Sequence, residues 1–101
     1  MADKVVFEDI GAGRFRVDGR LDFESVAGAL ATSQRLFAEY QAIQLDLSGV
    51  TATDSAGLAL LIEWISRAQR SKCKLSFLHV PAQVMAIARI SDVDKLLPLA
   101  S

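Results

Sequence analysis

The chain has 101 residues and is 51% hydrophobic, which is enough for the core of one domain but not of two. Eleven basic and twelve acidic residues give a formal net charge of -1, so there is no excess of positive charge to hold nucleic acid or an anionic membrane. The single cysteine, Cys73, excludes an internal disulfide, and with the single histidine, His79, it supplies too few ligands for a zinc site. We therefore expect a single domain over residues 1–101, without a metal or another cofactor.

The N-terminal residues predict a cytoplasmic location. Acidic residues occur at Asp3, Glu8 and Asp9, and this segment contains no apolar run of signal-peptide length. The longest apolar run, residues 56–62, is far shorter than the roughly twenty residues that cross a bilayer. We expect no direct insertion into a membrane.

The first elements in chain order are predicted to be a β-hairpin and a helix. Residues 5–7 and 15–17 are β-prone, and the turn-forming pair Gly11 and Gly13 separates them. Asp22 is placed to cap a helix whose apolar residues recur at helical spacing up to about residue 40.

A buried strand and a long helix are predicted next. Apolar residues at positions 43, 45 and 47 alternate with polar ones, and the strand is expected to stop at Ser48 and Gly49. A loop over residues 50–54 leads into an amphipathic helix from Ser55 to about Arg70. The core stripe of this helix is expected to be Leu58, Leu61, Ile62, Ile65 and Ala68.

The remaining chain predicts another strand, another helix and an apolar tail. The strand covers residues 74–78, and Pro81 suits the first turn of a helix over residues 82–90. Polar residues then end the helix, and Leu96, Leu97 and Leu99 are expected to pack back on the sheet.

The order β, β, α, β, α, β, α predicts an α/β fold, or α+β under a stricter definition. We expect a mixed sheet of four to five strands, with an N-terminal hairpin and about three helices packed against it. Functional groups in such sheets gather at the carboxyl ends of the parallel strands, and the loop after the central strand lies at such an end. This predicts a functional site within residues 51–57.

Ser55 is the first candidate for a functional residue. A serine at the start of a helix faces unpaired backbone N–H groups and the positive end of the helix dipole, so a phosphate there would be stabilised. Phosphorylation would add about -1.5 to -2 charges beside Asp54 and would repel an acidic partner surface. The alternative is that Asp54 or Ser55 only caps the helix, which contributes about 1 kcal/mol and needs no function. Spacing alone favours the cap.

Leu60 and Trp64 are the second candidates, because with Ala56 they project from a face of the long helix well away from the core stripe. A tryptophan beside a leucine is typical of an interface anchor. The two residues could equally pack beneath the first helix or the tail. The sequence gives both interpretations the same weight.

No grouping of residues predicts catalysis. His79 lies at the end of a predicted strand without a motif around it, and Cys73 is more typical of a buried small hydrophobe than of a nucleophile. Gly11 and Gly13 lack the third glycine and the following helix of a dinucleotide-binding loop. We expect a protein that is not an enzyme and that docks onto a partner around Ser55.

Residues 46–61, DLSGVTATDSAGLALL, resemble the signature of STAS domains, the fold shared by anti-sigma factor antagonists and by regulatory domains of anion transporters. Residues 17–26, VDGRLDFESV, are similar to the second strand of that family and the start of its first helix. The resemblance thus extends over nearly the whole chain. It implies a STAS fold with a regulatory serine or threonine after an aspartate, which here is Ser55 after Asp54.

Two branches of the family imply different partners. The motif of anti-sigma factor antagonists usually resembles DSSGLGVLLG, whereas here Ser55 is followed by Ala56, and Gly57 by LALLIEW. This pattern looks more like the STAS subunit of the Mla (maintenance of lipid asymmetry) phospholipid-transporting ABC system. That resemblance implies a cytoplasmic, non-catalytic subunit, peripheral at the inner membrane, which binds and regulates the ATPase subunit and through it contacts the permease.

The alternative is an anti-sigma factor antagonist that binds an anti-sigma kinase and is switched by phosphorylation of Ser55. In either case we expect the partner-binding residues to be Asp54, Ser55, Ala56, Gly57, Leu60 and Trp64.

Overall fold

The structure, a computed structural model, describes residues 4–100. Its strands form one four-stranded sheet in the order β1-β2-β3-β4. The strands are β1 (Val6–Gly11), β2 (Arg14–Leu21), β3 (Ala42–Thr53) and β4 (Lys74–Leu78). The helices are α1 (Val26–Ser33), α2 (Leu36–Glu39), α3 (Ser55–Arg70) and α4 (Ala82–Ile90), followed by a short 3-10 helix, η1 (Asp94–Leu96).

β1 and β2 form the predicted N-terminal hairpin, and they pair antiparallel. The turn residues Gly11, Ala12 and Gly13 have φ angles of 92°, 56° and 76°, in the left-handed region that favours glycine. A Cβ at Gly13 would lie 2.5 Å from the carbonyl oxygen of Ala42, so this glycine also lets the turn approach the start of β3. The prediction that both glycines serve a turn is confirmed.

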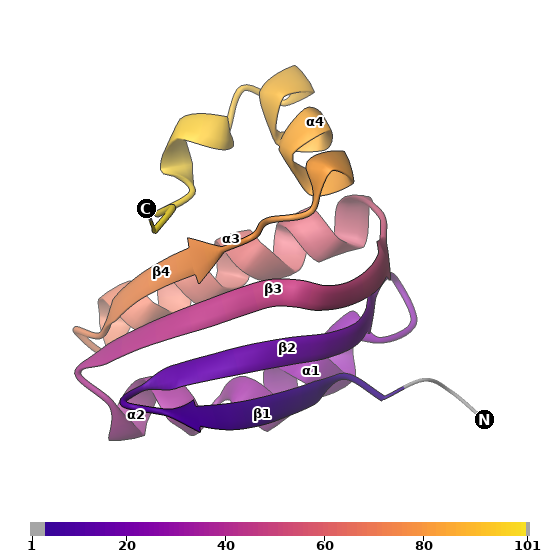
Figure 1. Ribbon diagram of the computed structural model, residues 1–101. Helices are drawn as coiled ribbons and strands as arrows, with labels where there is room; N and C mark the ends of the chain where they lie inside the picture. The colour runs from indigo at the N-terminus through magenta and orange to yellow at the C-terminus, as the bar shows by residue number, and fades with distance from the viewer. Residues whose placement is uncertain (1–3, 101) are drawn as a thin grey trace.

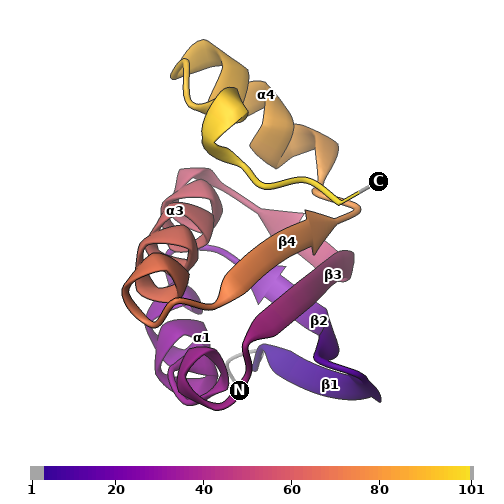
Figure 2. The same ribbon diagram turned by 90° about the vertical axis from the view of Figure 1, so that its left-hand side faces the viewer.

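The elements form two layers. β2, β3 and β4 run parallel to one another, and α1, α2 and α3 cover one face of the sheet (Figure 1). Figure 2 shows α4 beyond the β4 edge, next to α3, which contacts both α1 and α4. The predicted fold class, a mixed sheet with an N-terminal hairpin and helices packed against it, is confirmed.

β3 is longer than predicted, because it continues to Thr53 instead of stopping at Gly49. Its second half pairs with the second half of β2. Gly49 lies so close to β2 that a Cβ would collide with the carboxylate of Asp18. This glycine marks a close approach between two strands and not the end of one. The predicted loop before α3 is therefore reduced to Asp54.

The first predicted helix is in fact two helices, because α1 ends at Ser33 and α2 begins at Leu36. The Ser33 hydroxyl donates to the carbonyl oxygen of Leu30 at 3.0 Å, and a serine that bonds back in this way bends or ends a helix. Phe37 is buried after the break, so the periodicity of apolar residues continues across it. The pattern alone could not reveal two helices.

Leu60 and Trp64 belong to the core, so the interpretation that they lie on an exposed face is wrong. Leu60 is 3% exposed and Trp64 is completely buried. The indole Nε1–H of Trp64 donates to the Ser33 hydroxyl at 2.8 Å, and its ring meets that of Phe7 edge-to-face with 5.9 Å between the centroids. Packing beneath the first helix, the alternative that the sequence also allowed, is what the structure shows for Trp64.

The apolar tail returns to the sheet as predicted, but of its three leucines only Leu97 is buried, while Leu96 and Leu99 are exposed. The N–H of Phe77 in β4 donates to the Pro98 carbonyl, and the Phe77 carbonyl accepts the Ala100 N–H, both at 2.8 Å. The tail thus pairs with the edge of β4 that faces away from β3.

Candidate partner-binding site at the start of helix α3

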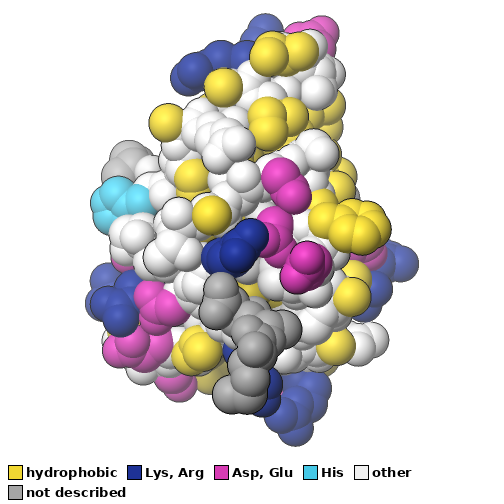
Figure 3. Space-filling view, turned by 90° about the vertical axis from the view of Figure 1, so that its right-hand side faces the viewer, with side chains coloured by type: hydrophobic (Ala, Val, Ile, Leu, Met, Phe, Trp, Pro, Cys, Tyr) yellow, Lys and Arg dark blue, Asp and Glu magenta, His cyan; other side chains and the backbone are white. Residues whose placement is uncertain are grey.

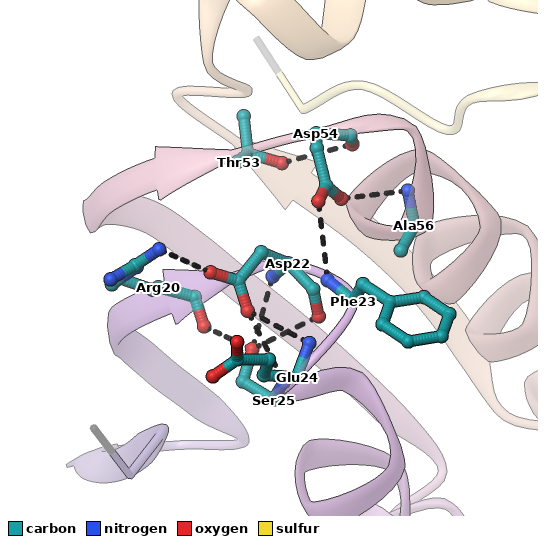
Figure 4. A network of polar contacts seen from close by, with 8 residues as sticks. All are labelled: Arg20, Asp22, Phe23, Glu24, Ser25, Thr53, Asp54 and Ala56. Carbon is teal, nitrogen blue, oxygen red and sulfur yellow. Dashed lines mark hydrogen bonds and ion pairs between the residues drawn. The ribbon is translucent and has the colours of Figure 1, made fainter. Parts of the chain in front are cut away.

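Two loops meet at the carboxyl ends of β2 and β3 (Figure 4). One, residues 22–25, joins β2 to α1, and the other is Asp54 alone. One carboxylate oxygen of Asp54 accepts the Ala56 N–H at 2.8 Å and caps α3, while the other accepts the Phe23 N–H at 3.2 Å. The predicted cap is confirmed, and the same carboxylate also fixes the two loops relative to each other.

Asp22 organises the loop before α1, but the prediction that it caps this helix is wrong, because the N-cap is Ser25 and the Asp22 carboxylate binds residues that precede α1. Its Oδ1 accepts the N–H groups of Glu24 at 3.1 Å and Ser25 at 3.2 Å, and its Oδ2 lies 2.8 Å from Nη2 of Arg20. Desolvation opposes ionisation of this carboxyl, but Arg20 and the backbone donors lower its pKa below the ordinary value. The loop is therefore held by an ionised carboxylate.

The predicted residues 54–57 lie together at the start of α3, but they differ in exposure. Ser55 is exposed, Asp54 and Ala56 are half-buried, and Gly57 is buried. A Cβ at Gly57 would lie 2.7 Å from the backbone carbonyl oxygen of Leu21 and would also collide with the Thr53 hydroxyl. Gly57 therefore lets α3 approach the sheet, and Ser55 is the exposed member of residues 54–57.

Phe23 is a surface residue of this site that the sequence analysis did not single out. Its side chain is 83% exposed, and it stands at the mouth of a groove of about 410 Å³ between α1 and α3. The groove is lined by Phe23, Val26, Ala27, Leu30, Ala56, Ala59, Leu60 and Glu63. Leu60 thus contributes to the groove although little of it is exposed, and Trp64 does not. An aromatic residue inside the polar turn sequence DFES was the signal that could have identified Phe23.

Acidic side chains gather beside a hydrophobic protrusion on the face where β2 and β3 end (Figure 3). Among the acidic residues of the two loops and α3, Asp22 pairs with Arg20, and Glu63 pairs with Arg67 at 3.0 Å. Within residues 4–100, the exposed Glu24 forms no ion pair. Figure 4 shows the Glu24 carboxylate turned away from the Phe23 ring, and Glu24 lines a different pocket together with Lys4.

A second polar contact lies on β3, away from Ser55. His79 Nδ1 is 2.9 Å from Oδ1 of Asp46. Desolvation opposes ionisation of Asp46, but hydrogen bonds from His79 and Ser48 lower the pKa of this carboxyl below its ordinary value. His79 thus pairs with a neighbouring strand, which agrees with the structural role predicted for it.

Cys73 is buried, as predicted, and burial raises the pKa of its thiol.

Among the residues that the structure describes, no group of three or more His, Cys, Asp or Glu is placed to hold a metal ion. No helix in residues 4–100 has the length and apolar character needed to span a bilayer.

A family model described as "Mlab, STAS domain" matches residues 8–98. The chain belongs to the STAS domain family. This confirms the resemblance to STAS domains that the sequence predicts. No curated protein matches the chain significantly.

Solved structures share the STAS fold of this chain. A putative anti-sigma factor antagonist of Thermotoga maritima has a TM-score of 0.76 at 16% identity, covering 96% of this chain and 86% of that chain. An anti-sigma-factor antagonist (STAS) domain protein of Planctomyces limnophilus has a TM-score of 0.73 at 17% identity, covering 97% and 90%. The unphosphorylated anti-sigma factor antagonist SpoIIAA has a TM-score of 0.70 at 15% identity, covering 96% and 88%. At these identities the likeness shows the fold alone.

Proposed function

We propose that this STAS protein is a non-catalytic subunit that binds and regulates the ATPase of a phospholipid-transporting ABC complex at the inner membrane. The Mlab description of the matching family model supports this choice of partner. In the proposed complex the protein is cytoplasmic, needs no cofactor, and reaches the membrane and the permease only through the ATPase.

The observation that carries the proposal is the exposure of Ser55 on a helix start that Asp54 already holds in place. A site formed before binding avoids the entropic cost of ordering a loop when the partner docks. The small side chains of Ser55 and Ala56 allow the partner's backbone to come close. A docking role uses each of these features, and none of them requires a reaction.

A negative charge at Ser55 is expected to weaken this contact. Phosphorylation would add about -1.5 to -2 charges beside the Asp54 carboxylate, and glutamate adds one charge with a longer side chain. A closely packed surface cannot accommodate that group without desolvating it. Ser55→Glu should therefore weaken assembly more than Ser55→Ala.

Affinity purification of the tagged chain from detergent-solubilised cells of its source organism tests the proposal, with partners identified by mass spectrometry. We expect stoichiometric recovery of an ABC ATPase and its permease with the unchanged protein and with Ser55→Ala, and loss of both with Ser55→Glu. Ser71→Glu is the matched control, because Ser71 is also exposed but follows the opposite end of α3. Equal recovery with both Ser55 variants would remove Ser55 from the contact.

The same experiment separates the alternative function. Recovery of a soluble kinase without membrane subunits would contradict the transporter proposal and would identify an anti-sigma factor antagonist. In that case phosphorylation of Ser55 would release the kinase.

A further inference from the structure

We infer that a hollow on the sheet face that α1, α2 and α3 leave uncovered binds a small organic molecule through its phosphate monoester group. The hollow lies at the amino ends of β2, β3 and β4, whereas Ser55 follows the carboxyl end of β3. It is therefore a second site, separate from the proposed contact with the ATPase, and it does not depend on which partner docks at Ser55.

Three parallel strands place the polar side chains of the hollow on one face. Arg14, Gln44 and Ser76 are paired in register across β2, β3 and β4. Each of them immediately precedes a buried core residue, and successive side chains of a strand alternate between faces, so these three point away from the helices (Figure 1). Ala42 and Lys74 form the neighbouring pair on the same face.

The size of the hollow suits a small molecule. Its volume is about 580 Å³, within the range of ligand pockets, and it extends to the hairpin turn at Ala12 and Gly13. Ala42, whose side chain is a single methyl group, lies between the strands that carry Arg14 and Lys74. A short side chain at this position leaves room for a ligand between the two longer ones.

The charge of the hollow is positive and uncompensated. Its lining contains two charged residues, Arg14 and Lys74, and within residues 4–100 neither side chain forms an ion pair. Further along the same face the charges compensate one another, since Arg16 pairs with Glu8 at 2.8 Å and with Asp18 at 3.0 Å. An anion is therefore attracted to the amino ends of the strands.

The donors of the hollow favour a phosphate monoester over a carboxylate. Two positive charges match the charge of about -1.5 to -2 that a phosphate monoester carries at pH 7, whereas a carboxylate carries one negative charge. The Arg14 guanidinium can donate to two phosphate oxygens, and Lys74 adds a second cation. The Gln44 amide and the Ser76 hydroxyl are further donors. β2 and β4 lie about 10 Å apart, so these long cationic side chains can close on the same anion from both sides.

The apolar part of the lining favours an organic ester over free phosphate. Ala12, Ala42, Ile43 and Leu75 contribute to it beside the cationic residues. An apolar group attached to the phosphate would cover this surface and remove it from water, which inorganic phosphate cannot do.

NMR titration of the full-length, isotope-labelled protein with three small probes tests the inference. Phenyl phosphate carries both the ring and the phosphate, benzoate has the ring with a single charge, and inorganic phosphate has the charge without the ring. We expect phenyl phosphate to shift the amide signals of residues 12–14, 42–44 and 74–76. It should bind at least about tenfold more tightly than either of the other probes.

Three variants and a control make the result specific. Arg14→Gln and Lys74→Gln should each weaken the binding of phenyl phosphate about tenfold, while the spectrum stays that of a folded protein because both side chains are exposed. Ala42→Leu, also at an exposed position, should block the hollow without changing its charge. Arg89→Gln removes an exposed cation from α4, outside the hollow, and should leave binding unaltered.

Several outcomes would overturn the inference: no shifts with phenyl phosphate, shifts on another surface, or equally tight binding of benzoate or inorganic phosphate. Binding that persists unchanged in Arg14→Gln, Lys74→Gln or Ala42→Leu would overturn it as well. Ser55→Glu should leave the titration unaltered, because Ser55 lies at the other end of β3. Failure to purify an ATPase with this chain would therefore contradict the proposed function alone.

Discussion

Asp54 binds the backbone N–H of Phe23, 31 positions earlier in the chain, through its Oδ2 at 3.2 Å. Through its Oδ1 the same residue caps α3. One side chain therefore links the start of α3 to the loop that presents Phe23. The stability of α3 and the geometry of the groove depend on a single carboxylate.

Asp54→Ala should lower the free energy of unfolding by about 1–2 kcal/mol, the usual cost of losing an N-cap. Asp54→Asn should retain only the helix cap, because its single amide oxygen can accept the Ala56 N–H while its NH2 group cannot accept the Phe23 N–H. Urea denaturation of the two variants and the unchanged protein measures the difference. Equal losses would show that the cap alone does not stabilise the site and that the second oxygen or the charge of Asp54 is required.

Ser33→Ala should destabilise the protein by about 1–3 kcal/mol, because it leaves the buried Nε1–H of Trp64 without an acceptor. Ser66→Ala, at an exposed position of α3, is the matched control and should change stability little. Thermal or urea denaturation gives both values. A loss no larger than that of the control would mean that the indole finds another acceptor.

Gly57→Ala should destabilise the fold by about 1–3 kcal/mol, because the new methyl group meets the backbone of Leu21 and the Thr53 hydroxyl. Gly28→Ala is the opposite case, since a Cβ at Gly28 has no neighbour within 4 Å. Gly28 lies inside α1, where alanine is favoured over glycine by about 0.5–1 kcal/mol, so this variant should be more stable than the unchanged protein. Parallel urea denaturation curves should therefore show a lower free energy of unfolding for Gly57→Ala and a higher one for Gly28→Ala.

The Asp46–His79 contact predicts an acid-dependent part of the stability. The pKa of Asp46 is lower in the folded protein than in the unfolded chain, so between these two values the unfolded chain binds more protons. The stabilisation is present above the ordinary pKa of the carboxyl and is lost as pH falls through the lower, folded value. Asp46→Asn should therefore make the free energy of unfolding less sensitive to acid, as measured by urea denaturation at a series of pH values. An unchanged pH dependence would contradict this role of Asp46.

The elements with a strong local signal could be predicted from the sequence. The bounds of α3, β4 and α4 agree with the predictions, because an N-terminal capping residue or a proline marks each helix start and alternation marks the strand. The positions of Asp54 as the N-cap and of Ser55 as the first residue of α3 could be predicted for the same reason, since a cap and the residue after it are local features.

The errors arose where the environment is set by residues distant in the chain. The sequence leaves Trp64 with two interpretations, an exposed anchor or a buried residue, because periodicity reveals one core stripe, whereas a helix packed between α1 and α4 buries more than one. The sequence predicts a strand end at Gly49, because a glycine after an alternating run is typical of a turn. The true reason for this glycine is its close approach to Asp18 in the neighbouring strand β2, which no local pattern reveals. Phe23 was not predicted because an aromatic residue is expected in the interior, although its place in the polar turn sequence DFES is a local signal for a surface position.

The central position of β3 has a consequence for the order in which the chain folds. Its parallel pairings join residues about thirty positions apart on each side, and such distant pairings form more slowly than the β1–β2 hairpin. During synthesis, the hairpin and α1 emerge before the strand that joins them to the rest of the sheet exists. We expect residues 46–61 to join the hairpin to β3 and to create the proposed docking surface in the same step, before β4 completes the sheet.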